Sequence, residues 1–525
     1  MQTNRYTTLF FFTFLAALTT ALPGAAQSAQ PKTTYQNPVI AGDFADPSVI
    51  RVGDTYYAVG TSSEWGPAFP IYASTDLVNW QYVGPVFAKL PDWIEGSYWA
   101  PELFHRNGLF YVYYTARRKS DAHSYIGVAT SRDLRQGFTD RGLLLEWTSE
   151  AIDAFVIEDN HRLYLTWKAY GLDKGKATEL LGAELSPDGL RVTGQAFTLL
   201  RADASTWEGG GAEGQALFKR GRYYYMTYSG NTCCGANCNY QVGLARAGSL
   251  RGPWEKFSGN PVLTSHDDWK CPGHGTVVTT PDKRYFYLHH AYKSDGFTFT
   301  GRQGVLTELV WNDQTGWPAF RYGTVTPAEA IAPTTHPQQL VNSITVNFGK
   351  TPATIPWVWD VHKSVPVYTI ANGQLRLNNV PADLVGSFLG LVVKESSYTL
   401  SVGIHPQESL WQSIGLYGDA RNALGVGVRG DSLELWQVRD GVRSQLQTQG
   451  LPSRSGPLTL RLTSRRGQFF TFGWITDGGA FQTLNSVEID GSFLPRWDRA
   501  PRLGISVRGP DAGGSRIDSL SLVYE

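Results

Sequence analysis

Four ionisable side chains recur at equivalent places in the first two thirds of the sequence. Five short aromatic runs each contain a marker tyrosine, namely Tyr57, Tyr111, Tyr164, Tyr224 and Tyr285. The residues 11 positions before these markers are, in order, Asp46, Ala100, Asp153, Glu213 and His274. Carboxylates that lie close together repel one another and shift their pKa values, so a purely structural protein has little reason to gather three of them. The pattern therefore predicts a functional site.

Neighbouring carboxyl groups suit general acid–base catalysis, in which one carboxyl is protonated and another is ionised. The sequence is also rich in aromatic residues, at 13%, and poor in charged ones, at 18%, against about 25% in ordinary domains. Aromatic rings stack on the CH-rich faces of neutral sugars, so the predicted chemistry is hydrolysis of a glycosidic bond. A calcium site built from Asp46, Asp153 and Glu213 is the alternative, but no dense Asp/Asn loop of the calcium-binding kind surrounds them.

The charge balance excludes one large class of function. Lys and Arg number 46, Asp and Glu number 46, and the formal net charge is zero. Proteins that bind nucleic acid normally carry a positive excess, so no nucleic-acid partner is expected.

The N-terminus has the features of a secretory signal peptide over residues 1–26. Arg5 supplies a positive charge, the run from Leu9 to Leu22 is apolar apart from three threonines, and small residues follow at Gly24-Ala25-Ala26. The apolar run is shorter than the roughly 20 residues that a membrane span needs. We expect a secreted or periplasmic protein with no membrane insertion after cleavage.

An exported chain can form disulfides among its four cysteines, which are Cys233, Cys234, Cys238 and Cys271. Because two of them are sequence neighbours, we expect at least one of those two to pair with Cys238 or Cys271. A zinc site is the rival interpretation, but the paired C-x₂-C spacing is missing. The expected role is to stabilise a loop that shapes the rim of the site.

The five aromatic runs also predict the fold. Each is preceded by another β-prone run and a turn with Gly, Asn or Asp, as expected for a hairpin, and the units repeat every 53 to 61 residues. Five such units predict an all-β fold that begins with a five-bladed β-propeller over residues 35–330. The first strand of every blade lines the axis, which would bring the four ionisable residues together. A β-sandwich is the competing interpretation, although it has no reason to repeat at this period.

Several short motifs resemble those of glycoside hydrolase family 43 over roughly residues 35 to 330. They are Ala45-Asp46-Pro47-Ser48-Val49-Ile50, Trp99-Ala100-Pro101-Glu102, Ile152-Asp153-Ala154-Phe155-Val156, Ala212-Glu213-Gly214-Gln215-Ala216-Leu217 and Gly273-His274-Gly275-Thr276-Val277-Val278. The family's fold is a five-bladed propeller, in agreement with the repeat. Its members are inverting enzymes that act on arabinofuranose or xylose residues of plant cell-wall polysaccharides.

The resemblance implies a role for each axial residue. Asp46 would be the general base that activates water, Glu213 the general acid, and Asp153 the residue that raises the acid's pKa and orients it. His274 resembles a histidine that in some members helps bind a central metal ion, often calcium; a buried, hydrogen-bonded histidine is the alternative. Arg302 would reach the sugar. No cofactor is required for the chemistry itself.

Aromatic residues near the motifs are candidates for stacking on sugar. Trp99 and Phe155 are the candidates we assign to substrate binding, together with His274 and Arg302, and Trp65 and Trp207 are weaker ones. Gln215 and Ala154-Phe155 depart from the residues that many relatives have there, which leaves substrate preference open. Glu208 lies five residues before the predicted acid and is interpreted as a loop residue.

The last third of the sequence predicts a second domain over residues 340–525. Five prolines between residues 327 and 356 indicate a connection, and alternating runs such as Leu458-Thr459-Leu460-Arg461-Leu462 indicate an antiparallel β-sandwich. It resembles the concanavalin-like domain that follows the propeller in some family members. Such a domain would either brace the propeller and contribute a loop to the rim, which we favour, or bind carbohydrate.

Together these features predict an inverting glycosidase that releases terminal α-L-arabinofuranosyl or β-D-xylosyl residues from plant cell-wall polysaccharides or oligosaccharides. An endo-acting arabinanase and a non-catalytic, carbohydrate-binding propeller are the alternatives. Retention of all three carboxylates disfavours the second of these. The sequence leaves open the preference for arabinose or xylose, exo or endo action, and the oligomeric state.

Overall fold

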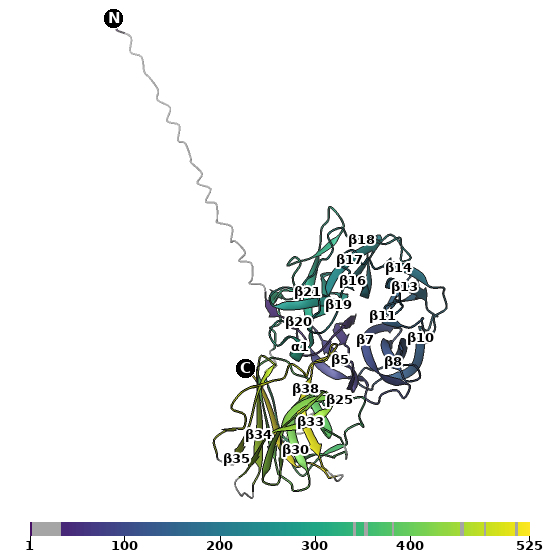
Figure 1. Cartoon of the computed structure of the whole chain (residues 1–525). Helices are drawn as coiled ribbons and strands as arrows, with labels where there is room; N and C mark the ends of the chain where they lie inside the picture. Colours follow the sequence, from purple (N-terminus) through teal and green to yellow (C-terminus); the bar gives the residue numbers. More distant parts are fainter. Residues whose placement is uncertain are drawn as a thin grey trace.

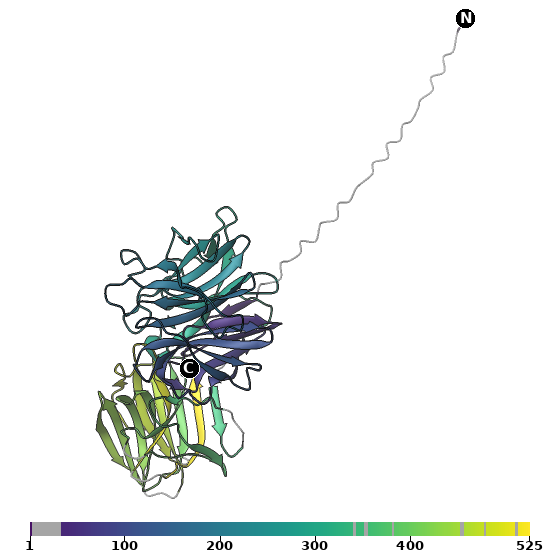
Figure 2. The same cartoon turned by 90° about the vertical axis from the view of Figure 1, so that its right-hand side faces the viewer.

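The computed structural model describes residues 1–2, 33–339, 343–350, 355–380, 383–451, 456–476, 479–509 and 513–525. The predicted signal peptide lies outside these ranges except for its first two residues. The described chain is almost entirely β-strand, with one helical turn, α1 (Phe297–Thr300), and none of its helices is long and apolar enough to cross a membrane. Figures 1 and 2 show a propeller and a sandwich packed side by side. The predicted all-β fold is confirmed.

Five four-stranded antiparallel sheets form the blades of the propeller, each built from strands that are nearly consecutive in the chain. Blade 1 consists of β2 (Ser48–Val52), β3 (Thr55–Val59), β5 (Ala68–Ser74) and β6 (Gln81–Phe87). Blade 2 consists of β7 (Ile94–Arg106), β8 (Leu109–Arg118), β9 (Ser124–Ser131) and β10 (Thr139–Leu145). Blade 3 consists of β11 (Ala151–Asp159), β12 (Arg162–Ala169), β13 (Glu179–Glu184) and β14 (Phe197–Arg201). Blade 4 consists of β15 (Glu213–Arg220), β16 (Tyr223–Gly230), β17 (Gln241–Ala247) and β18 (Glu255–Lys256), and blade 5 of β19 (Trp269–Thr279), β20 (Tyr285–Lys293), β21 (Arg302–Trp311) and β22 (Pro318–Phe320).

The blades close into a ring around an axis lined by their first strands. β2, β7, β11, β15 and β19 contact one another in that order, and β19 returns to β2. The two ends of the propeller meet where β1 (Thr34–Gln36) pairs with β23 (Glu329–Ile331). Apolar clusters fill the spaces between neighbouring blades, so the hydrophobic effect holds the ring closed and fixes the axial strands.

Two packed antiparallel sheets form the C-terminal sandwich. The nine-stranded sheet contains β24 (Ser343–Asn347), β26 (Tyr368–Ala371), β27 (Gln374–Leu377), β29 (Tyr398–Ile404), β34 (Leu458–Arg465), β35 (Phe469–Thr476), β36 (Gln482–Thr483), β37 (Ile489–Asp490) and β39 (Ile517–Tyr524). The six-stranded sheet contains β28 (Ser387–Leu391), β30 (Trp411–Asp419), β31 (Asn422–Arg429), β32 (Ser432–Arg439), β33 (Val442–Gly450) and β38 (Arg502–Arg508). In β34 the side chains of Leu458, Leu460 and Leu462 are buried while the intervening ones are partly exposed, as the alternating sequence predicts.

The sandwich is joined to blade 1 through backbone and side chains. β25 (Trp359–Asp360), which lies between β24 and β26 in the chain, pairs with β4 (Trp65–Gly66). The Trp65 ring is buried in a cluster with Phe388 and Tyr417 of the sandwich, so the weaker candidate sugar platform at Trp65 is wrong: the ring fills the interface between the domains.

A buried ion pair crosses the same interface. Arg502 of β38 donates from Nη1 to Asp43 Oδ2 at 3.1 Å, and its guanidinium lies 4.8 Å from the centre of the Trp65 ring. Both side chains are almost fully buried. Removing one partner would leave the other charge buried without compensation.

We therefore expect Arg502→Met to lower the free energy of unfolding by about 3 kcal/mol. Urea denaturation followed by tryptophan fluorescence measures the loss. The matched control is Arg466→Met, because Arg466 pairs with Asp295 at 3.7 Å with its side chain 69% exposed. An exposed pair contributes less than about 1 kcal/mol. Equal losses in the two variants would show that the Arg502 pair does not anchor the sandwich.

Candidate active site

The axial residues lie at irregular points of the first strands. Asp46, Ala100, Asp153 and His274 all have positive φ, between 38° and 58°, a conformation uncommon for residues other than glycine. In β7, β11 and β19 the strand register shifts at or beside these positions. Such irregularities interrupt pairing and re-aim side chains. The shared conformation explains why the chemistry recurs at one point of the repeat.

Blade 4 departs from the repeat by one residue. There the residue with positive φ is Gly214, at 57°, and Glu213 comes one position earlier. A Cβ atom on Gly214 would lie 2.6 Å from Cγ of His274, so only glycine fits this position. The Gly214 N–H donates to Asp153 Oδ2 at 3.3 Å, which links the fourth blade to the third.

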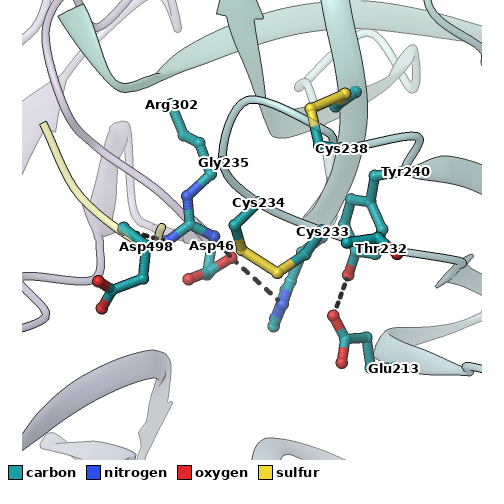
Figure 3. The surroundings of a disulfide bond; sticks show 12 residues. Asp46, Glu213, Thr232, Cys233, Cys234, Gly235, Cys238, Tyr240, Arg302 and Asp498 are labelled. Carbon is teal, nitrogen blue, oxygen red and sulfur yellow. Dashed lines mark hydrogen bonds and ion pairs between the residues drawn. A yellow bond between two sulfur atoms is a disulfide. The ribbon is translucent and has the colours of Figure 1, made fainter. Parts of the chain in front are cut away.

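Asp46 is buried among hydrogen-bond donors. Thr61 Oγ1 donates to its Oδ2 at 2.7 Å, and Arg302 Nη1 donates to its Oδ1 at 3.1 Å, as Figure 3 shows for Arg302. His290 Nδ1 lies 3.1 Å from the same Oδ1. Burial opposes ionisation, but Arg302 and the imidazoles of His274 and His290 outweigh it and hold the pKa of Asp46 well below its usual range. Asp46 is therefore an ionised carboxylate, as a general base must be.

His274 lies between two of the carboxylates. Its Nδ1 is 3.4 Å from Asp46 Oδ1 and 3.9 Å from Asp153 Oδ2, and its backbone N–H donates to Ser229 Oγ at 2.9 Å. Burial raises the pKa of Asp153 to about 7, repulsion from Glu213 adds to the rise, and His274 opposes it. Asp153 thus carries a proton over much of the range below neutral pH.

Glu213 is held by two donors that the sequence did not single out. Lys168 of β12 contacts Glu213 Oε2 at 2.7 Å, and Tyr240 Oη donates to Oε1 at 2.8 Å. Lys168 also lies 3.8 Å from Glu150, a second buried carboxyl. Burial alone would raise the pKa of Glu213, but Lys168, His274 and Tyr240 together lower it. The sequence predicted a raised pKa for Glu213, but the carboxyl whose pKa is raised is Asp153, and the pKa of Glu213 is lowered.

The sandwich reaches the candidate site through one loop. Asp498 accepts from Arg302 Nη2 through its backbone oxygen at 3.1 Å, and from the Trp99 indole N–H through Oδ2 at 3.3 Å. The neighbouring Trp497 is 58% exposed, and its ring meets Trp99 edge to face at 5.8 Å between centroids. Trp99, predicted from the sequence to bind sugar, is thus part of the rim together with Trp497.

Two disulfides lie beside this centre, one between Cys233 and Cys234 and one between Cys238 and Cys271. The expectation that one of the neighbouring cysteines pairs with Cys238 or Cys271 is therefore wrong. The Cα atoms of Cys233 and Cys234 are 3.7 Å apart, and these two sequence neighbours are bridged to each other. Figure 3 shows this disulfide between the Asp46–Arg302 pair and the Tyr240–Glu213 pair.

Other predicted residues have structural roles. Phe155 is buried in the apolar cluster between blades 3 and 4, where it is core rather than a sugar platform, and Trp207 packs against the same cluster. Glu208 is a buried loop residue that accepts from Tyr228 and Lys256. Gln215, one of the departures from the family pattern, donates to the backbone oxygen of Asp153 at 2.6 Å and so fixes the axial strand.

The donors around His274 do not make a calcium site built from side chains. Calcium takes six to eight oxygen ligands, whereas His274 Nδ1 lies within 4 Å of a single carboxylate oxygen from each of Asp46 and Asp153. In the part of the chain that the structure describes, no group of three or more His, Cys, Asp or Glu side chains is placed to hold a metal ion. The expected calcium stays a prediction, and no step is assigned to it.

Comparison with known proteins adds independent evidence. The model of the family described as glycosyl hydrolases family 43 matches residues 35–318. The sequence is 27% identical over 305 residues to the extracellular exo-α-(1→5)-L-arabinofuranosidase ArbA of Cellvibrio japonicus, covering 53% of this chain and 86% of that protein. It is 28% identical over 313 residues to a β-xylosidase of Formosa agariphila, covering 54% of this chain and 50% of the relative.

A solved structure extends the likeness to both domains. The crystal structure of a xylan β-1,4-xylosidase from Bacillus halodurans C-125 matches with a TM-score of 0.82, covering 93% of this chain and 100% of the other. At 20% identity this match shows the fold alone. The propeller and the sandwich therefore belong to one shared architecture.

The Lys168 contact gives a prediction on pH dependence. Lys168→Met removes the cation that lowers the pKa of Glu213, so Glu213 would stay protonated to higher pH. An acid catalyst loses activity as pH rises through its pKa. The alkaline limb of kcat/KM should therefore move upward by about one pH unit or more. The pH–rate profile for an aryl glycoside measures this shift.

Lys176→Met is the control for Lys168→Met, because Lys176 is 55% exposed in a surface pair with Asp173. The control should leave the profile unchanged. An alkaline limb that stays in place or moves to lower pH in Lys168→Met would contradict the role given to this contact.

Proposed function

This chain belongs to glycosyl hydrolase family 43, and from that premise we propose that it is an exported, inverting glycosidase. It releases terminal α-L-arabinofuranosyl or β-D-xylosyl residues from plant cell-wall polysaccharides or oligosaccharides. The observation that carries the proposal is the convergence of the axial carboxyls around His274, where Arg302 and the imidazoles hold Asp46 ionised and burial keeps a proton on Asp153 toward neutral pH. Export is proposed from residues 1–26 and is supported by the extracellular relative.

The proposed reaction is a single displacement. Asp46 takes a proton from a water molecule whose oxygen attacks the anomeric carbon. The bond from that carbon to the leaving oxygen breaks, and Glu213 protonates this oxygen. Glu213 starts this step in its protonated form and ends it ionised. Thr61 and Arg302 orient the base, and Lys168 and Tyr240 orient the acid.

Terminal rather than internal cleavage is proposed because the sandwich closes one side of the rim. Asp498 contacts both Trp99 and Arg302, and Trp497 stands beside them. A chain running through the centre in both directions would meet this loop. The named relatives support the choice of sugars, since one is an exo-arabinofuranosidase and another a β-xylosidase.

Hydrolysis of 4-nitrophenyl α-L-arabinofuranoside and of the β-D-xyloside tests the proposal. Loss of the acid in Glu213→Gln or of the base in Asp46→Asn should lower the rate by about 10²- to 10⁴-fold. Glu158→Gln is the matched control, because Glu158 is a partly exposed surface carboxylate paired with Arg106. Undiminished activity in Glu213→Gln would refute the acid assignment. Release of oligosaccharides instead of monosaccharide from linear arabinan would show an endo-acting enzyme.

A further inference from the structure

The segment between β16 and β17, residues 231–240, is fastened both to itself and to blade 5. We call it the cysteine loop. It contains the Cys233–Cys234 disulfide, and Cys238 is joined to Cys271 of β19, the strand that carries His274. Thr232 and Asn239 are hydrogen-bonded across its base. The proposed catalytic scheme makes no use of the Cys233–Cys234 disulfide.

The cysteine loop ends at the tyrosine that holds the acid. Tyr240 is fully buried, and its hydroxyl donates to Glu213 Oε1 at 2.8 Å. Its ring stacks on His290, with centroids 5.7 Å apart, and His290 in turn lies against Asp46. Cys233 packs against the apolar cluster formed by Tyr240, Cys271 and Tyr292. Movement at Cys233 would therefore reach the Tyr240 ring.

The same loop contacts the residues that hold the base. The backbone N–H of Gly235, which follows the disulfide, donates to Tyr292 Oη at 3.1 Å. Tyr292 is paired with Arg302 in the β20–β21 ladder, and Arg302 binds Asp46 at 3.1 Å. On its outer side Gly235 lies against the sandwich: a Cβ atom there would make a tight contact of 3.3 Å with the backbone oxygen of Trp497. The loop thus contacts residues beside both the acid and the base and lies against the sandwich.

A disulfide between sequence neighbours restrains the backbone locally. It closes a small ring around one peptide bond, which is itself planar, so few conformations remain for the two residues. Sulfur is also polarisable and packs well against aromatic rings. In the view of Figure 3 the disulfide is drawn between the Asp46–Arg302 pair and the Tyr240–Glu213 pair. Its restraint can reach Tyr240 through the packing of Cys233 and Tyr292 through the Gly235 N–H.

We propose that the Cys233–Cys234 disulfide is a positioning element for catalysis, which holds Tyr240 against Glu213 and Tyr292 beside Arg302. This role rests on the proposed function, because the disulfide would act within the same reaction. The disulfide fixes the acid relative to the base. Without it the Tyr240 hydroxyl loses its fixed place, and proton delivery to the leaving oxygen suffers first.

The test compares leaving groups in the variant Cys233→Ala/Cys234→Ala. A 2,4-dinitrophenyl glycoside needs little help from the acid, whereas the matching disaccharide needs much. We expect kcat to fall about tenfold or more for the disaccharide and less than about twofold for the activated glycoside. Tyr240→Phe should show the same selectivity, and adding it to the double variant should cause little further loss.

Cys238→Ala/Cys271→Ala is the control, since it removes the other disulfide of the loop. It should lower the melting temperature without changing the dependence on leaving group. The proposal is overturned if kcat of the folded Cys233→Ala/Cys234→Ala variant falls equally for both substrates. It is also overturned if thiol titration of active wild-type protein finds these two cysteines reduced. Wild-type protein that hydrolyses neither glycoside would instead refute the proposed function.

Discussion

The carboxyl groups of Asp46, Asp153 and Glu213 lie around one axis, where they repel one another when ionised. The surrounding side chains offset this repulsion. Each carboxyl group lies near a cationic or imidazole side chain: Arg302 binds Asp46, Lys168 binds Glu213, and His274 lies between Asp46 and Asp153. Burial would favour protonation of all three carboxyl groups. Because these side chains favour ionisation of the three carboxyls to different degrees, Asp46 is held ionised while the pKa of Asp153 is raised to about 7.

This constraint explains why the ring of blades must be complete. Asp46 enters from the start of blade 1 but is bound by Arg302 of blade 5, and Glu213 of blade 4 is bound by Lys168 of blade 3. The compensating charges are therefore never on the same blade as the group they serve. The sandwich contributes to the same balance, because Asp498 fixes the second amino group of Arg302 from outside the propeller.

The residues that recur in every blade could be predicted from the sequence, whereas those at unrepeated positions could not. The tyrosine spacing located the axial residues because Asp46, Ala100, Asp153 and His274 share one irregular backbone position of the repeat, and Glu213 lies one residue before it. Lys168 and Tyr240 belong to no repeated position, and only the folded ring brings them to Glu213. The sequence shows that Phe155 is close to Asp153, but it does not show which side of the irregular strand the Phe155 ring faces. The ring faces the core. The Cys233–Cys234 bond is local, yet pairing cannot be deduced from cysteine spacing.

In the proposed reaction Asp46 removes a proton from water and does not itself attack the sugar. Proton NMR of the sugar released in the first moments of hydrolysis, before mutarotation, tests this directly. We expect the anomeric configuration of the initial product to be inverted relative to the substrate. An initial product with retained configuration would contradict it, because retention requires a carboxylate that attacks the anomeric carbon and forms a covalent intermediate.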